Sequence, residues 1–215
     1  GIDYVKFAVL YTGADGTKVP GASNDKLYGY LVANPYQGEV DGEKKAAYDI
    51  WTGSGDVKTV YVDASTDNTN AVAGNVISYS EDGKYIDEVT IVGKIGANAA
   101  ASTGMVAITG VNGDTIAYKS GSATESTEYT YDFDKDCVFI AVNDDKTEGA
   151  EGSKDTVTKA NEFVDGSTTY YIPNAYIVTD VDGSKTVVVA VIFDADDSEL
   201  DVSYGAGSVG MLIQK

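Results

Sequence analysis

Short runs in which apolar and polar residues alternate recur along almost the whole sequence, and tight-turn signals separate them. A period of two residues is the mark of a strand with one buried face. Asp-Gly or Asn-Gly pairs between the runs supply the positive φ angles that tight hairpin turns require. We therefore expect an all-β protein. The runs cover residues 4–11, 27–32, 46–51, 57–62, 75–79, 86–92, 105–111, 114–118, 129–133, 138–142, 170–172, 175–179 and 186–193, and the pairs stand at 15/16, 41/42, 82/83, 112/113, 165/166 and 182/183.

The choice of apolar residues supports the same fold class. The chain has 26 Val against 5 Leu, together with 16 Tyr. Branching at Cβ restricts χ1 in a helix but packs well on a pleated surface. Only Ser153 to Phe163 could form a helix, with Ser153 or Asp155 as its cap, so we expect one short helix at most.

An internal repeat organises the chain. Residues 75–92 align with 175–192 when the Asp-Gly turns at 82/83 and 182/183 are superposed. Residues 57–63 correspond to 138–144 at an offset nearer 80, which places an insertion in the second copy. The alignment matches Ile77 with Ile177, Val89 with Val189 and Ile91 with Val191.

The repeat predicts two tandem small β-barrel or sandwich-like modules joined by a short Ala/Gly/Ser linker, and leaves barrel and sandwich as alternatives. The first module would take residues 27–95, the linker 96–104, and the second module 105–194 with a polar insertion at 143–165. Residues 1–26 would add a strand to the first module or finish a preceding one. Residues 195–215 would form an acidic loop and a C-terminal strand.

The charged residues exclude most enzyme classes. The chain has 34 acidic and 15 basic residues, a net charge of −19, and every basic residue is Lys. Without His there is no Ser-His-Asp unit, and without Arg there is no bidentate phosphate fork. We expect no nucleic-acid partner, because binding to nucleic acid depends on cationic side chains. No apolar run is long enough for direct membrane insertion. The sequence starts at Gly1 without a signal peptide, so we expect it to be a fragment of a longer chain.

A tandem strand-and-turn pattern extends over roughly residues 27–194. Its segments are Tyr28-Gly-Tyr-Leu-Val, Tyr48-Asp-Ile-Trp-Thr-Gly, Val60-Tyr-Val-Asp, Gly74-Asn-Val-Ile-Ser-Tyr and Asp82-Gly-Lys-Tyr-Ile-Asp-Glu-Val. This pattern resembles the β modules that accompany S-layer homology domains in cell-surface proteins of Gram-positive anaerobic bacteria. The resemblance implies a surface or spacer role, anchoring elsewhere in the parent chain, and no catalytic residues.

Two acidic segments are candidates for calcium. Asp132, Asp134 and Asp136 have the spacing that opens a calcium loop, but Cys137 stands where that loop needs Gly, so we interpret them as solvent-facing residues of a strand whose Phe133 points inward. The segment after the last long strand is denser in carboxylates, and a solvated acidic loop is the alternative there. Its candidate ligands are Asp194, Asp196, Asp197 and Glu199.

Aromatic residues suggest a second kind of site. Trp51, with Tyr30, Tyr36 and Tyr48, could form a platform on which sugar rings stack, and the alternative is that Trp51 fills the core or its rim. Alternation places Asp49 and Trp51 on one face of their strand and Tyr48 on the other. The single cysteine, Cys137, is expected to be a buried and inert thiol.

The sequence therefore favours a non-catalytic segment of a secreted bacterial cell-surface protein, acting as a structural spacer, a surface-layer-associated module or an adhesion module. We expect no cofactor apart from the calcium alternative. The expected partners are other modules of the parent chain, cell-surface components, or glycans. A carbohydrate-binding module for cell-wall or host glycans is the first alternative, and an acidic hydrolase with a carboxylate pair is the second.

Overall fold

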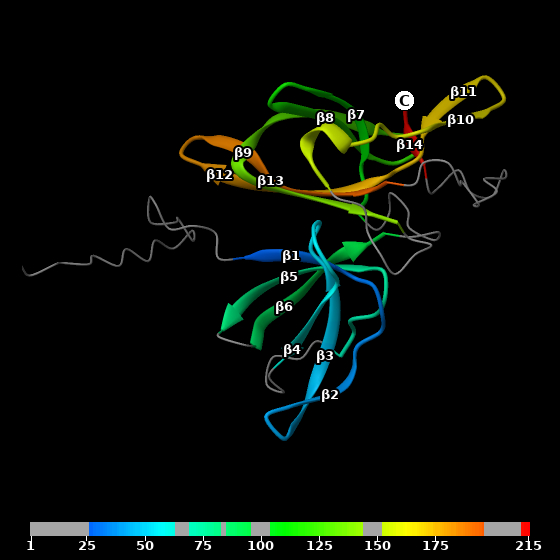
Figure 1. The fold of residues 1–215 in the computed structure, drawn as a ribbon. Helices are drawn as coiled ribbons and strands as arrows, with labels where there is room; N and C mark the ends of the chain where they lie inside the picture. The colour runs from blue at the N-terminus through cyan, green and yellow to red at the C-terminus, as the bar shows by residue number, and fades with distance from the viewer. Residues whose placement is uncertain (1–25, 63–68, 83–84, 96–103, 144–151, 196–211) are drawn as a thin grey trace, which may run out of the picture.

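The computed structural model describes residues 26–62, 69–82, 85–95, 104–143, 152–195 and 212–215. The fold is all-β with several sheets, as expected from the sequence (Figure 1). The one helix in these ranges is a single 3-10 turn, η2 (Lys154–Thr156), within the stretch for which one short helix was expected. The Ser153 amide donates to Thr156 Oγ1 over 2.8 Å at its start.

The first sheet contains every described strand up to residue 94. Its order is β1-β5-β6-β4-β3-β2, and β4 and β6 are parallel neighbours. An additional pairing of β1 with β3, through Tyr30 with Trp51 and Leu31 with Ile50, bends the sheet into a partial ring. The strands are β1 (Leu27–Leu31), β2 (Tyr36–Val40), β3 (Glu43–Trp51), β4 (Lys58–Val62), β5 (Asn75–Asp82) and β6 (Tyr85–Lys94).

The second sheet has the order β12-β13-β9-β8-β7, with β9 and β13 as parallel neighbours. An isolated bridge between Val106 and Ala175 joins the segment before β7 to the start of β12. The Val106 amide donates to the Ala175 carbonyl over 2.8 Å. The strands are β7 (Ala107–Asn112), β8 (Thr115–Gly121), β9 (Ser126–Val142), β12 (Ala175–Asp182) and β13 (Lys185–Asp194).

A third, three-stranded sheet is attached to the second. Its order is β10-β11-β14, from β10 (Glu162–Asp165), β11 (Thr168–Tyr171) and β14 (Ile213–Gln214). The Gln214 amide donates to the Ser122 carbonyl over 2.8 Å, and the Ala160 amide donates to the Ile108 carbonyl over 2.8 Å. Strand β14 is thus an edge strand of this small sheet.

Turn chemistry acts as the sequence predicts in the four hairpins whose Asp-Gly or Asn-Gly pair lies within the described residues. In the β2–β3 hairpin both loop residues, Asp41 and Gly42, have positive φ (53° and 79°). In the β7–β8, β10–β11 and β12–β13 hairpins, Asn or Asp is the last residue of the first strand and Gly is the first of the two loop residues. A type II′ turn needs a positive φ at that first loop position. Those glycines are Gly113, Gly166 and Gly183, with φ of 61°, 60° and 63°.

Three strands differ from the sequence-based expectation. Strand β2 was not expected, because Gly38 and Glu39 interrupt its apolar alternation, yet it pairs with β3 along its whole length. Strand β9 is continuous, whereas two strands, 129–133 and 138–142, were expected. Strand β10 lies in the predicted polar insertion and overlaps the candidate helix, because pairing with β11 outweighs a weak helix signal.

Apolar side chains gather in three main clusters. One lies within the first sheet around Tyr48, Ile50 and Ile77, and another lies within the second sheet around Ile108, Ile116 and Phe193. The remaining cluster takes residues from both sheets and joins them. It contains Tyr28, Tyr30, Trp51, Val76 and Ile95 on one side and Met105, Ile140, Val142, Tyr176, Ala190 and Ile192 on the other.

The predicted boundary at 96–104 falls almost entirely outside the described residues, as do the predicted strand at 4–11 and residues 1–25. The division into two tandem modules therefore stays a prediction at this point.

Candidate functional sites

Trp51 lies in the apolar cluster between the first two sheets, where its ring is only 4% exposed. Its indole Nε1 donates a hydrogen bond to the carbonyl of Ala141 over 2.8 Å, across 90 positions in sequence. Tyr30, its cross-strand partner, is 5% exposed in the same cluster. These two rings hold the first sheet against the second.

The other two residues of the expected aromatic platform lie elsewhere. Tyr48 is fully buried within the first sheet, on the opposite face of β3 from Trp51, as alternation predicts. Tyr36 is 47% exposed, and its hydroxyl donates to Asp49 Oδ1 over 3.3 Å. The four aromatic residues therefore do not share one exposed face in this structure.

A different group of tyrosines does share a face. Cross-strand register places Tyr36 opposite Ala47, Ala47 opposite Tyr61, and Tyr61 opposite Tyr85, on the adjacent strands β2, β3, β4 and β6. Partners in register point to the same side of a sheet. We call Tyr36, Tyr61 and Tyr85 the tyrosine row, and it lies on the face opposite to Tyr48 and Ile50. The sequence did not predict the tyrosine row, because Tyr61 and Tyr85 become neighbours of Tyr36 only through the register of the paired strands.

Polar groups border the tyrosine row on both sides. Asp49 Oδ1 accepts hydrogen bonds from Thr59 Oγ1 over 2.7 Å and from the Tyr36 hydroxyl. On the other side the Lys45 ammonium lies 5.4 Å from the centre of the Tyr85 ring and 3.3 Å from Glu43 Oε2. The result is a face of flat rings between hydrogen-bonding groups.

A second group of tyrosines lies on β8 and β9. Tyr118 and Tyr129 are cross-strand partners with stacked rings 5.4 Å apart, and Tyr131 is 6.0 Å from Tyr129. Burial, and then the neighbouring Tyr131 and Tyr129, raise the pKa of Tyr118 to about 12. Tyr118 packs in the cluster of the second sheet, and Tyr129 is 36% exposed at its margin.

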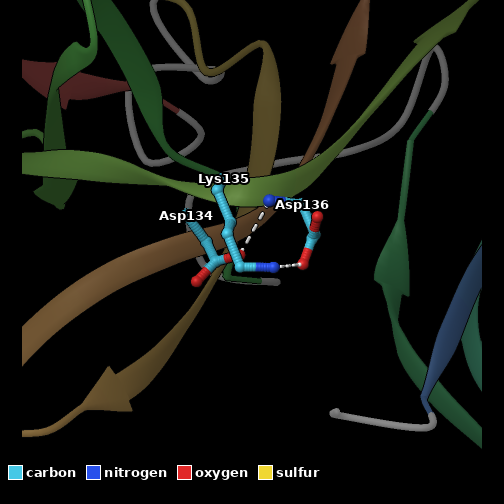
Figure 2. A network of polar contacts seen from close by, with 3 residues as sticks. All are labelled: Asp134, Lys135 and Asp136. Atoms are coloured by element: carbon cyan, nitrogen blue, oxygen red, sulfur yellow. Dashed lines mark hydrogen bonds and ion pairs between the residues drawn. The ribbon is translucent and has the colours of Figure 1, made fainter. Parts of the chain in front are cut away.

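Asp134 and Asp136 lie at an irregularity in β9. Figure 2 shows these two residues with Lys135 between them. Phe133 pairs with Val188 and Val138 pairs with Ala190, so β9 has more residues than β13 between these two points. The Asp136 amide donates to Asp134 Oδ1 over 2.8 Å, and the Lys135 ammonium pairs with the Asp136 carboxylate. The hydrogen bond from the Lys135 ammonium to the Asp136 carboxylate raises the pKa of Lys135. Phe133 packs toward the core as expected, while the bulge interrupts the regular alternation of the aspartates.

Asp194 is the one residue of the calcium candidate that the structure describes. It ends β13, and its backbone carbonyl accepts a hydrogen bond from Thr158 Oγ1 over 2.9 Å. Asp196, Asp197 and Glu199 lie outside the described residues. Within the described ranges no three His, Cys, Asp or Glu side chains are arranged to hold a metal ion.

Cys137 is half-buried beside the cluster of the second sheet. Burial, with a smaller effect of the Asp134 charge, raises the pKa of its thiol to about 12. The thiol is therefore protonated at neutral pH, a state with little nucleophilic reactivity.

No helix in the described part of the chain has the length and apolar character to cross a membrane. Comparison of the chain with protein-family models, curated proteins and solved structures gave no match to any of them.

Proposed function

We propose that the chain is a non-catalytic spacer segment of a secreted bacterial cell-surface protein, built from two tandem β modules that are held together as one stiff unit. The observation that carries this proposal is the use of one strand arrangement twice, with a shared apolar cluster between the two copies.

Strand order supports the tandem modules. The first sheet contains the order β5-β6-β4-β3-β2, and the second sheet has the order β12-β13-β9-β8-β7. In both, the successive pairings are antiparallel, parallel, antiparallel and antiparallel. Five strands linked mainly by short hairpins, with one parallel neighbour pair, suit a small, partly open Greek-key barrel.

Register supports the same conclusion at the level of single residues. Ile77 pairs with Ile91 in the first sheet, and Ile177 pairs with Val191 in the second. These are the positions that the internal repeat superposes at an offset of 100. The insertion expected at 143–165 in the second copy includes η2 and β10, which lie between β9 and β12.

The junction between the two copies supports stiffness. Trp51 fixes the first sheet to the Ala141 carbonyl of β9, and the Gly152 amide donates to the Gly53 carbonyl over 3.1 Å. At Gly93 an added Cβ would lie 2.1 Å from Cζ of Tyr176, so the backbone of β6 and the Tyr176 ring are in close contact. Apolar packing of this kind resists bending, as a spacer under load requires.

An extracellular position fits the net charge of −19, which keeps a densely displayed protein soluble and discourages contact with anionic surfaces. The proposed partners are neighbouring modules of the parent chain and surface components of the same cell.

Small-angle scattering of the purified chain tests the stiffness, and protease treatment of intact cells that produce the parent protein tests the location. The scattering curve should be that of one compact pair of modules. Protease treatment of intact cells should remove the segment. The Trp51→Ala variant should broaden the distribution of interatomic distances, while Tyr36→Phe, which changes only an exposed hydroxyl, should not.

Scattering from two independently moving modules in the unmodified chain would contradict a stiff spacer. Protection of the segment until cells are broken would contradict the surface location. Release of reducing sugar from cell-wall polysaccharide by the purified chain would contradict the non-catalytic role.

A further inference from the structure

We propose that the tyrosine row is a binding face for a neutral saccharide. This proposal is independent of the spacer function, because it rests only on side chains of the first sheet and not on the junction between the sheets.

The row has the dimensions of an extended site. Tyr36, Tyr61 and Tyr85 lie on strands in the spatial order β2-β3-β4-β6, where β2, β4 and β6 carry the rings and β3 carries Ala47. Neighbouring strands are about 4.8 Å apart, so the row extends over about 14 Å. A short oligosaccharide can lie across such a surface and contact more than one ring.

Two small residues shape the face. Ala47 is fully buried beneath its neighbours although it lies on the outer side of the sheet. At Gly38 an added Cβ would lie 2.8 Å from Cε1 of Tyr61 and 3.0 Å from Cβ of Ala47. The Tyr61 ring therefore lies close over the backbone of β2, because Gly38 leaves room for it. Tyr61 is half-buried, so part of its side chain stays open to a ligand.

The polar groups match the hydroxyl groups of a sugar. The Asp49 carboxylate can accept hydrogen bonds from sugar hydroxyls. The hydroxyls of Tyr36 and Thr59 now donate to Asp49, and each can donate to a ligand instead. The Lys45 ammonium is a donor on the opposite border of the row. Tyrosine combines an apolar ring with a polar tip, so it suits a ligand that alternates C–H and O–H groups.

Charge selects a neutral ligand. On this face the Lys45 ammonium is paired with Glu43, and its side chain is only 15% exposed, so it gives little attraction to an anion. The chain as a whole has a net charge of −19 and repels polyanions. An uncharged saccharide needs no counter-charge and has both kinds of group that the face offers.

Titration of the full isotope-labelled chain with cellohexaose, chitohexaose and mannohexaose, followed by NMR chemical shifts, tests the proposal. At least one of these sugars should shift the amide signals of β2, β3 and β4. Tyr61→Leu, which keeps an apolar cover over Gly38, should weaken that binding about tenfold, as loss of one aromatic contact does. Gly38→Ala, which displaces the Tyr61 ring, should weaken it in the same direction.

Tyr129→Ala is the matched control, because it removes a partly exposed tyrosine of the second sheet and should leave the affinity unchanged. Fluorescence of the single tryptophan reports whether each variant is folded. Three results would overturn the proposal: no shift with any neutral sugar, equal affinity in folded Tyr61→Leu and the unmodified chain, or shifts confined to the second sheet. Binding of polygalacturonate or of a strand-forming peptide to this face, without any neutral sugar, would also overturn it.

Discussion

At the scale of single residues, Trp51 shows how one side chain connects distant parts of the fold. Its ring fills the cluster between the sheets, and its indole N–H satisfies the Ala141 carbonyl. A large aromatic ring contributes most when it is buried and its polar atom has a partner.

We predict that Trp51→Phe lowers the free energy of unfolding by about 1 to 3 kcal/mol, because a buried carbonyl loses its donor and a smaller ring leaves space. Denaturant unfolding followed by circular dichroism measures the change. Tyr36→Phe is the control and should stay within about 0.5 kcal/mol of the unmodified chain, since Tyr36 is exposed. Equal stability of the two variants would show that the Trp51 contact is not required.

Tyr79 gives a prediction about alkaline pH. Burial, and then the charge of Glu81, raise its pKa to about 12, from an ordinary value near 10. Between these values the unfolded chain loses the phenolic proton first, so the free energy of unfolding falls as pH rises from about 10 to about 12. We expect Tyr79 alone to account for about 2 kcal/mol of this loss.

Denaturant unfolding at several pH values across this range, with the Tyr79→Phe variant in parallel, measures the effect. The variant has no proton to lose at this position, so its stability should fall less steeply with pH. Identical slopes for the two chains would show that Tyr79 titrates normally in the folded state.

At the scale of elements, pairing between strands decides more than local sequence does. Strand β2 forms on the β3 edge despite its weak pattern, and β9 continues through a bulge because β8 pairs with its first part and β13 runs beside it on both sides of the irregularity. Hairpin turns are local, and the Asp-Gly and Asn-Gly pairs therefore predicted them well, whereas strand lengths depend on partners far away in sequence.

Closure of the first sheet depends on a close approach at Gly29. An added Cβ there would lie 2.1 Å from Cγ2 of Ile50, whose strand pairs with β1 to complete the partial ring. We predict that Gly29→Ala destabilises the chain by about 1 to 3 kcal/mol, because the β1–β3 contact must open.

Gly110→Ala is the matched control, since the nearest side-chain atom there is Lys159 Cε at 4.0 Å. It should be neutral or slightly stabilising, as Ala restricts the unfolded chain. Thermal unfolding of both variants measures the difference. A Gly29→Ala protein as stable as the control would mean that the ring closure contributes little.

At the scale of the whole molecule, charge is the dominant feature. The 34 acidic residues outnumber the 15 basic ones and repel one another over the surface. Ion pairs such as Lys154 with Asp114 at 2.7 Å are exposed contacts. Exposed pairs contribute little to stability. Salt should therefore stabilise this protein by screening repulsion and not destabilise it by weakening ion pairs.

We predict that raising sodium chloride from about 0.01 M to about 0.15 M, which shortens the screening length from about 30 Å to about 8 Å, increases the Tm by about 2 to 4 °C. Thermal unfolding in sodium chloride and in calcium chloride of matched ionic strength separates screening from binding. An extra calcium effect that Asp194→Asn reduces would support the calcium candidate at residues 194–199. A Tm that falls with salt would contradict the account of the charge.

Features that depend on neighbouring residues or on composition could be predicted before the fold was known. Alternation and turn pairs predicted the all-β fold and the hairpins, and the absence of His and Arg removed whole classes of chemistry. Which aromatic rings are buried, and which lie together, depends instead on contacts between distant parts of the chain. Trp51 meets Ala141 across 90 positions, and Tyr36, Tyr61 and Tyr85 become neighbours through strand register. Alternation along a strand predicts that residues i and i+2 share a face of the sheet. Pairing with strands distant in sequence determines which side chains pack against that face.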